Sequence, residues 1–399
     1  MEYIPIDGGK KFVALVNDVM KIVDRSGTRI YLWIDTIAVD VTNEVRGSML
    51  ELGSARFDLS SIFDDKPWLY AYTIDSVENY VAWLKNFVDN ALKGSKVLAA
   101  FSGGKDSTTV LLVLRELAKY IDFEFYALYV HMPYIEPLEN PRFAKEVADR
   151  LGIELVVVEP PRKEVLKELM CSGLPRRGAR LCTYIKVVPM RFYTKSRLVN
   201  YVAYGDRVWE AGKRFQRLFC RTLYAKIFAS KRMGFTPIAP LTLLDVVKAC
   251  RDHGLVHPMY LRGVQRVACS YCPYKPVYEF YVVEKKLEDP GIVEDAMKSG
   301  WKRYYRDRGI PWEDYERFHL WRFSPTLAKA LLEAKYMVEK LAKDRDTIDA
   351  KNFVRSLASL WIENIDAPRI DIENIVRALK RLCEERRSGE ALHHPSGWD

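Results

Sequence analysis

Apolar positions in the middle of the chain alternate between short continuous runs and longer amphipathic stretches. Short apolar runs are typical of buried strands, whereas apolar residues spaced three and four apart are typical of helices that cover a core. The expected strands cover residues 97–101, 123–132, 153–160 and 198–205, and a further apolar segment covers 235–241. The expected helices cover 76–94, 107–121, 139–152 and 243–254. Strands separated by crossover helices predict an α/β fold with a doubly wound, mostly parallel sheet.

The two ends of the chain show different patterns. Residues 10–26 carry apolar positions at helical spacing, and a β-branched run follows at 29–42, so we expect a small α+β extension over residues 1–75. Strand signals fade after about residue 276. Three amphipathic patterns then predict a helical C-terminal region, at residues 324–344, 347–366 and 371–387. The expected division of the chain is 1–75, 76–280 and 281–399.

Composition limits the class of protein. The chain has 399 residues, of which 49% are hydrophobic, which is ample for folded cores. No run of about 18 apolar residues and no secretory pattern at the start is found, so we expect a cytoplasmic protein that does not enter a membrane. Only two glutamines accompany 29% charged residues, a balance typical of heat-adapted proteins.

Positive charge is concentrated in one segment. The net charge is +9, but residues 162–232 contain 18 Lys or Arg and four acidic residues. Single cations mostly solvate helix faces, whereas a stretch this unbalanced favours a polyanionic ligand such as a nucleotide or an RNA.

A glycine-rich loop follows the expected strand 97–101. Its sequence is Ser102-Gly103-Gly104-Lys105-Asp106-Ser107. Glycines let successive N–H groups converge on a phosphate, and the N-terminus of the following helix adds partial positive charge. We expect Asp106 to hold Mg²⁺ against a pyrophosphate, Lys105 to add a charge, and the hydroxyls of Ser102, Ser107 and Thr108 to donate. The alternative is an ordinary Gly-Gly turn that starts a helix.

Seven cysteines occur, and two of them have the spacing of metal ligands. An odd number in a chain without secretory features argues against a disulfide scaffold. Cys269 and Cys272 form a Cys-x-x-Cys motif followed by Pro273, which can place two thiolates on one metal. Zn²⁺, a disulfide or free thiols remain open for this pair.

An ordered set of motifs follows the glycine-rich loop. It comprises Cys182-Thr183 with Lys186 and Pro189; Gly205-Asp206-Arg207 with Glu210 and Arg214; Pro237-Ile238; His257-Pro258-Met259-Tyr260; Gly263; and Arg266 with Cys269, Cys272 and Pro273. The loop resembles the PP-loop of the adenine nucleotide alpha-hydrolase superfamily. The whole set, over residues 76–280, resembles the phosphoadenylyl-sulfate (PAPS) reductase family, and in particular an archaeal iron–sulfur member.

The resemblance implies roles for individual residues. It implies that Lys186, Arg214 and Arg266 bind the nucleotide with the loop, and that Asp106, Lys105, Arg207 and Glu210 act in catalysis. It also implies that Cys182 joins Cys269 and Cys272 around a 4Fe-4S cluster, with Zn²⁺ as the alternative. The fourth ligand is Cys171, Cys220, Cys250 or none.

The resemblance leaves three functions open. The first is ATP-dependent adenylylation followed by sulfur transfer to an anionic substrate such as tRNA. The second is reduction of adenylyl sulfate or PAPS, and the third is a non-catalytic nucleotide- and cluster-binding subunit. The reductases carry a nucleophilic cysteine near the C-terminus, but Cys383 lacks their motif and lies on an apolar helical stripe, which favours a core thiol. The sulfide or electron donor and a homo-oligomeric state are not determined by the sequence.

Overall fold

The computed structural model gives the arrangement of most of the chain. It describes residues 2–6, 11–16, 19–23, 28–60, 70–179, 181–210, 234–282 and 286–387, together with residues 215, 218, 228 and 229. No helix in these ranges is long and apolar enough to cross a membrane.

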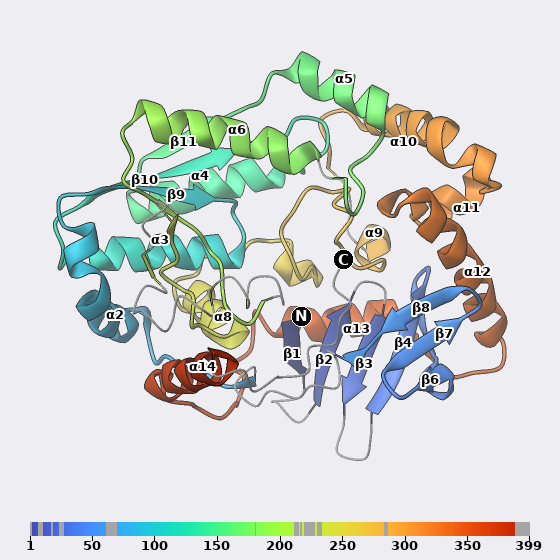
Figure 1. Cartoon of the computed structure of the whole chain (residues 1–399), viewed down its shortest axis with the longest axis horizontal. Helices are drawn as coiled ribbons and strands as arrows, with labels where there is room; N and C mark the ends of the chain where they lie inside the picture. The colour runs from blue at the N-terminus through green and yellow to red at the C-terminus, as the bar shows by residue number, and fades with distance from the viewer. Residues whose placement is uncertain are drawn as a thin grey trace.

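A parallel sheet lies at the centre of the described part of residues 76–280. Its strands, in spatial order, are β11 (Leu155–Val158), β10 (Glu124–Val130), β9 (Lys96–Phe101), β12 (Tyr201–Ala203) and β13 (Gly234–Phe235). Every neighbouring pair is parallel. The predicted doubly wound α/β fold is therefore confirmed, with β9 in the middle and the chain moving outward on each side of it (Figure 1).

The helices that lie where the apolar spacing predicts them are α2 (Val77–Leu92), α3 (Lys105–Leu117), α4 (Glu139–Leu151) and α8 (Leu243–Asp252). Helices α5 (Arg162–Ser172) and α6 (Leu181–Ser196) form in the cation-rich segment, where the sequence pattern predicted none. Ser76 caps α2 by accepting a hydrogen bond from the N–H of Asn79. Thr242 and Asp245 form a capping box on α8. Most of α3 is buried, which makes it the central helix of the domain.

The N-terminal segment forms an antiparallel sheet, so the helix predicted at residues 10–26 is wrong. The strands are β1 (Glu2–Ile6), β2 (Lys11–Val16), β3 (Val19–Val23), β4 (Thr28–Ile34), β5 (Ile37–Asp40) and, from much later in the chain, β14 (Thr347–Asp349). Residues predicted as a helix at 10–26 form β2 and β3. The two strands pair along an antiparallel ladder, from Phe12 opposite Val23 to Val16 opposite Val19, and this tertiary pairing outweighs the helical spacing. A small sheet of β6 (Val45–Arg46), β7 (Met49–Leu52) and β8 (Ala55–Asp58) follows.

The C-terminal region is helical and packs against the N-terminal sheets. Its helices are α9 (Glu279–Val282), α10 (Pro290–Tyr304), α11 (Trp312–Arg317), α12 (Pro325–Leu341), α13 (Ala350–Ser359) and α14 (Ile372–Arg387). Residues 347–349, expected in a helix, instead form β14 beside β5. Helix α12 packs on β4, β7 and β8, and its Lys335 donates to the carbonyl of Trp33 (Figure 1). The division at residues 75 and 280 stays a prediction.

Candidate functional site

The candidate site lies where the order of the parallel strands reverses. The chain leaves β9 into the glycine-rich loop, and it leaves the neighbouring strand β12 into Gly205 and Arg207. Ligands of open α/β sheets bind at this switch point, outside the carboxyl ends of the strands. The structure therefore brings two segments about a hundred residues apart to the same edge.

The glycine-rich loop is held by the hydroxyl of Ser107. This oxygen accepts a hydrogen bond from the N–H of Ser102 at 3.2 Å and donates to the carbonyl of Gly104 at 3.0 Å. Gly103 has φ +72°, a left-handed conformation that favours glycine. A Cβ on Gly205 would lie 3.0 Å from backbone and side-chain atoms of Asp106, so the second segment packs directly on the start of α3.

Asp106 is held between two cations. Its Oδ1 accepts from Arg207 Nε at 2.6 Å, and its Oδ2 lies 3.2 Å from Lys105 Nζ. Burial by itself would raise the pKa of Asp106, but Arg207 and Lys105 hold it below its usual range. The carboxylate predicted to hold Mg²⁺ is thus already paired with two cations, which leave further lone pairs on both oxygens.

Two buried polar groups near the loop have no hydrogen-bond partner among the described residues. His257 is 1% exposed; its Nδ1 accepts from the N–H of Met259, which leaves Nε2 carrying an unpaired hydrogen. The ring lies 4.0 Å from the position of a Cβ on Gly103. The hydroxyl of Thr108, on the first turn of α3, is the second such group. Unpaired donors beside a helix N-terminus fit a phosphate.

Burial lowers the pKa of His257 to about 4, so its imidazole is neutral near pH 7. A neutral ring with Nδ1 accepting can donate one hydrogen bond through Nε2. The motif His257-Pro258-Met259-Tyr260 is visible in the sequence, but nothing in its pattern assigns the histidine a role in the site.

A buried carboxylate that the sequence analysis missed lies after β10. Glu136 accepts from Tyr129 Oη at 3.0 Å, from the N–H of Met132 at 2.7 Å and from Asn140 Nδ2 at 3.3 Å. Burial alone would raise the pKa of Glu136, but Lys186, His131 and the Met132 N–H lower it to about 2. No motif spacing identifies this residue, because its partners come from the strand, the loop and α6.

Three thiols are gathered around Lys186. The ammonium lies 3.7 Å from Glu136 Oε1, and it interacts electrostatically with Cys182, Cys269 and Cys272. Although burial opposes its charge, Glu136 and these thiols raise the pKa of Lys186. Burial raises the pKa of the Cys269 thiol to about 12, against the opposing effect of Lys186.

The turn that carries two of these thiols is fixed by arginines. The N–H of Cys272 donates to the carbonyl of Cys269 at 3.1 Å. Arg177 and Arg322 both donate to the carbonyl of Pro273, at 2.9 and 3.2 Å. Arg177 follows α5 and Arg322 lies just before α12, so both the parallel-sheet domain and the C-terminal region position this turn.

The donor set fits a thiolate-bound metal or cluster in its chemistry. Cys182, Cys269 and Cys272 form no disulfide, and all three lie in the field of one cation. Within the described ranges, however, no three Cys, His, Asp or Glu side chains lie close enough to hold one metal ion. Ligation thus requires the three thiols to approach one another.

The candidates for a fourth ligand lie elsewhere or outside the described residues. Cys250 is buried under the loop, where its Sγ is 3.5 Å from the carbonyl of Lys105 and 3.7 Å from Thr109 Oγ1. Cys171 is exposed at the end of α5, and its carbonyl accepts from Arg303. Cys220 and the side chain of Cys383 lie outside what the structure describes.

The remaining predicted residues have separate positions. Glu210 follows Arg207, to whose carbonyl its N–H donates at 3.4 Å. Arg266 is exposed and interacts electrostatically with Glu279. Lys186 contacts Glu136 and the thiols rather than the loop. Arg214 lies outside the described residues.

The parallel α/β sheet and the glycine-rich loop after its central strand are the features predicted from the resemblance to PP-loop proteins. Residues 96–275 match the family model of the phosphoadenosine phosphosulfate reductase domain. The predicted family is thereby confirmed.

Two tRNA sulfurtransferases are similar to about half of this chain. A tRNA-cytidine(32) 2-sulfurtransferase of Vibrio cholerae is 22% identical over 220 residues, which cover 52% of this chain and 67% of that protein. One of the same name from Chromohalobacter salexigens is 23% identical over 217 residues, covering 52% and 73%.

Solved structures show weaker overall likeness. The U34-tRNA thiolase NcsA from Methanococcus maripaludis, solved with its [4Fe-4S] cluster, has a TM-score of 0.34 and 17% identity, covering 57% of this chain and 80% of that one. An NH₃-dependent NAD synthetase from Campylobacter jejuni has a TM-score of 0.31 and 17% identity, covering 59% and 95%.

Proposed function

We propose that this protein is an ATP-dependent sulfurtransferase that modifies RNA. The observation that carries the proposal is a series of residue contacts that connects the glycine-rich loop, called the phosphate loop below, with the three thiols. The carbonyl of Asn140 lies 3.7 Å from the Cβ position of Gly103, and its side chain donates to Glu136, which pairs with Lys186 among the three cysteines. The sulfurtransferase relatives and the positive segment 162–232 support RNA as the substrate.

The reaction has two steps. A carbonyl-type oxygen of the substrate attacks the α-phosphate of ATP, the bond to the β-phosphate breaks, and pyrophosphate leaves. Hydrosulfide from a sulfide donor then attacks the activated carbon, and AMP leaves with the oxygen. In the first step the loop N–H groups, His257 Nε2 and the Lys105–Arg207 pair stabilise the phosphate charge.

Cys182, Cys269 and Cys272 would hold the iron–sulfur cluster. When bound by three protein thiolates, a 4Fe-4S cluster supplies an iron that is open to exogenous sulfide. Lys186 partly neutralises the charge of the thiolates and keeps them oriented through its pairing with Glu136.

The test uses the full chain purified without oxygen. We expect iron and acid-labile sulfide in the protein, pyrophosphate release from ATP that depends on added unfractionated tRNA, and a thiolated nucleoside when sulfide is supplied. Cys269→Ser should lose most of the iron, whereas the matched variant Cys250→Ser, under the loop, should keep it. Iron-free protein loaded with zinc, or pyrophosphate release indifferent to tRNA, would contradict the proposal.

The family match favours one second candidate, a sulfonucleotide reductase. In that case the loop holds the phosphosulfate of adenylyl sulfate or PAPS, and a cysteine thiolate attacks its sulfur with release of the nucleotide. The two functions differ in a direct competition experiment. A sulfurtransferase binds ATP in preference to PAPS and forms no sulfite, whereas a reductase shows the reverse.

A further inference from the structure

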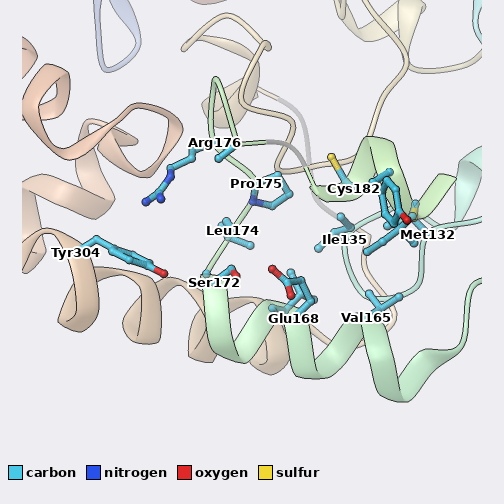
Figure 2. Close-up of a pocket in the computed structure, with 15 residues that line it drawn as sticks. Met132, Ile135, Val165, Glu168, Ser172, Leu174, Pro175, Arg176, Cys182 and Tyr304 are labelled. Carbon is cyan, nitrogen blue, oxygen red and sulfur yellow. The ribbon is translucent and has the colours of Figure 1, made fainter. Parts of the chain in front are cut away.

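A cavity of about 480 Å³ lies beside Cys182, separate from the phosphate loop. Helix α5, the segment after it, the start of α6 and the loop after β10 form its walls. In Figure 2, Val165 and Glu168 rise from α5, Cys182 lies on the other side together with Ile135, and Arg176 and Tyr304 lie at the far end. This volume is typical of pockets for small molecules, roughly 300–1,000 Å³.

The walls are mostly apolar, but one of them carries a carboxylate. Met132, Ile135, Val165, Leu169, Leu174 and Ile185 supply the apolar surface. Glu168 is half-buried there, and its carboxylate has no hydrogen-bond or ion-pair partner among the described residues. A carboxylate in such surroundings needs a donor, so an entirely apolar ligand would leave it unsatisfied.

The surroundings of the cavity suit a nucleic acid strand. Arg176 lies over the ring of Tyr304 at 4.6 Å, and Lys163 and Lys167 are exposed on α5. On α6, Tyr184 borders the cavity at 64% exposure, and Phe192 lies two turns further on at 69%. Exposed aromatic rings among cations are the surfaces on which single-stranded bases stack while phosphates are neutralised.

We propose that this cavity binds the target base of the RNA, unpaired and turned out of its strand, and that Glu168 selects a base with an exocyclic amine. The inference rests on the proposed function. A base has apolar faces that match the walls and an N–H edge that matches the carboxylate. Carboxylates accept from the amine of cytosine, whereas the corresponding edge of uracil presents a carbonyl that Glu168 repels. Cys182 lines the cavity, so one of the three thiols lies beside the bound base.

The test compares single-stranded RNAs of equal length made of cytidine, adenosine, uridine or abasic ribose phosphate. Dissociation constants of the full chain are measured by fluorescence anisotropy at one salt concentration. We expect cytidine RNA to bind about tenfold more tightly than uridine or abasic RNA, because cytosine carries both the amine that Glu168 accepts from and the carbonyl oxygen that the proposed reaction needs. Adenine has the amine but no carbonyl oxygen, so adenosine RNA tests recognition of the amine alone.

Two variants make the test specific. Glu168→Gln should lose the preference for the amine-bearing base over uridine, whereas the matched control Glu164→Gln, on the exposed face of the same helix, should keep it. Ser172→Phe fills the cavity from the end of α5, and it should reduce the affinity for every RNA to that for the abasic RNA. Thermal unfolding checks that each variant is folded.

Equal affinity of the wild-type protein for cytidine, adenosine and abasic RNA would overturn the assignment, as would an unchanged preference in Glu168→Gln. Pyrophosphate release from ATP is measured in parallel. Normal pyrophosphate release without a base preference would refute only the assignment of the cavity as a base-binding site. Absence of pyrophosphate release would refute the proposed function.

Discussion

His257 shows how burial sets the chemistry of a single residue. It is 1% exposed beside the phosphate loop, and burial lowers its pKa to about 4. A charged imidazole at this position would bind phosphate more strongly but would be costly without the ligand. The neutral ring instead keeps one N–H available for hydrogen bonding, which is a weaker but pH-independent donor above about pH 5.

The depressed pKa of His257 predicts a stability change with pH. The unfolded state binds a proton near pH 6.5, whereas the folded state binds it near 4. Stability from the neutral ring is therefore complete above about pH 6.5 and is lost as pH falls through about 4, by roughly 3 kcal/mol.

Urea unfolding at about pH 7 and about pH 4.5 measures this effect. The free energy of unfolding of wild-type protein should fall more steeply with acidification than that of His257→Gln, which has no titrating group there. Parallel pH profiles for the two proteins would contradict the assignment.

A second residue-scale prediction concerns the Asp106 ion pairs. Arg207→Met removes the closer cation, at 2.6 Å, and leaves a largely buried carboxylate with Lys105. We expect the free energy of unfolding to fall by about 3 kcal/mol and ATP affinity to decrease. Denaturant unfolding and calorimetric titration with ATP measure both. The exposed control Arg191→Met on α6 should change stability by less than about 0.5 kcal/mol.

At the scale of elements, the C-terminal helices support the phosphate loop. Tyr260, in the 3₁₀ turn η3 (Tyr260–Arg262), accepts a hydrogen bond from the N–H of Lys105 at 2.9 Å. Its ring stacks on Trp361, just after α13, with centroids 4.0 Å apart. Helix α13 also lies against Gly263, where a Cβ would overlap Val354 Cγ1. The first turn of α3 is thus braced by residues distant in sequence.

Two glycines with similar backbone angles allow the contribution of the contact with α13 to be distinguished from that of the left-handed backbone. Gly263 has φ +81° and contacts Val354, whereas Gly309 has φ +72° with nothing within 4 Å of its Cβ position. We expect Gly309→Ala to cost about 1 kcal/mol from the left-handed backbone alone. Gly263→Ala should cost at least about 3 kcal/mol, because α13 must also move. Chemical denaturation of the two variants measures the difference, and equal losses would show that the contact with α13 is unimportant.

At the scale of the whole molecule, positive charge is concentrated in one segment, and the two ends of the chain pack together in another part of the fold. The net charge of +9 results from an excess of cations in residues 162–232, which include α5 and α6 beside the thiols. The N-terminal sheets and C-terminal helices pack together on the other side of the chain, joined by β14 and by Arg345 paired with Glu44 at 2.6 Å (Figure 1).

This distribution predicts salt-dependent RNA binding through α6. The logarithm of the association constant should fall linearly with the logarithm of salt concentration, because each neutralised phosphate releases counterions. Arg191→Ala combined with Lys195→Ala should reduce the slope by about 1 or more. The control Lys329→Ala, exposed on α12, should leave the slope unchanged. An equal slope for the wild type, the double variant and the control would show that the RNA does not bind along α6.

The sequence by itself determined the features that depend on neighbouring residues. The strand 97–101, the glycine-rich loop and the capped helices follow from local apolar spacing and from conformational preferences, so they could be predicted. Tertiary structure decided the rest, because it depends on pairing between distant segments. It made residues 11–23 into strands and added residues 347–349 to their sheet. It also gave Asp106 two cations and assembled Glu136 and Lys186 among the thiols, whereas it placed Cys250 under the loop.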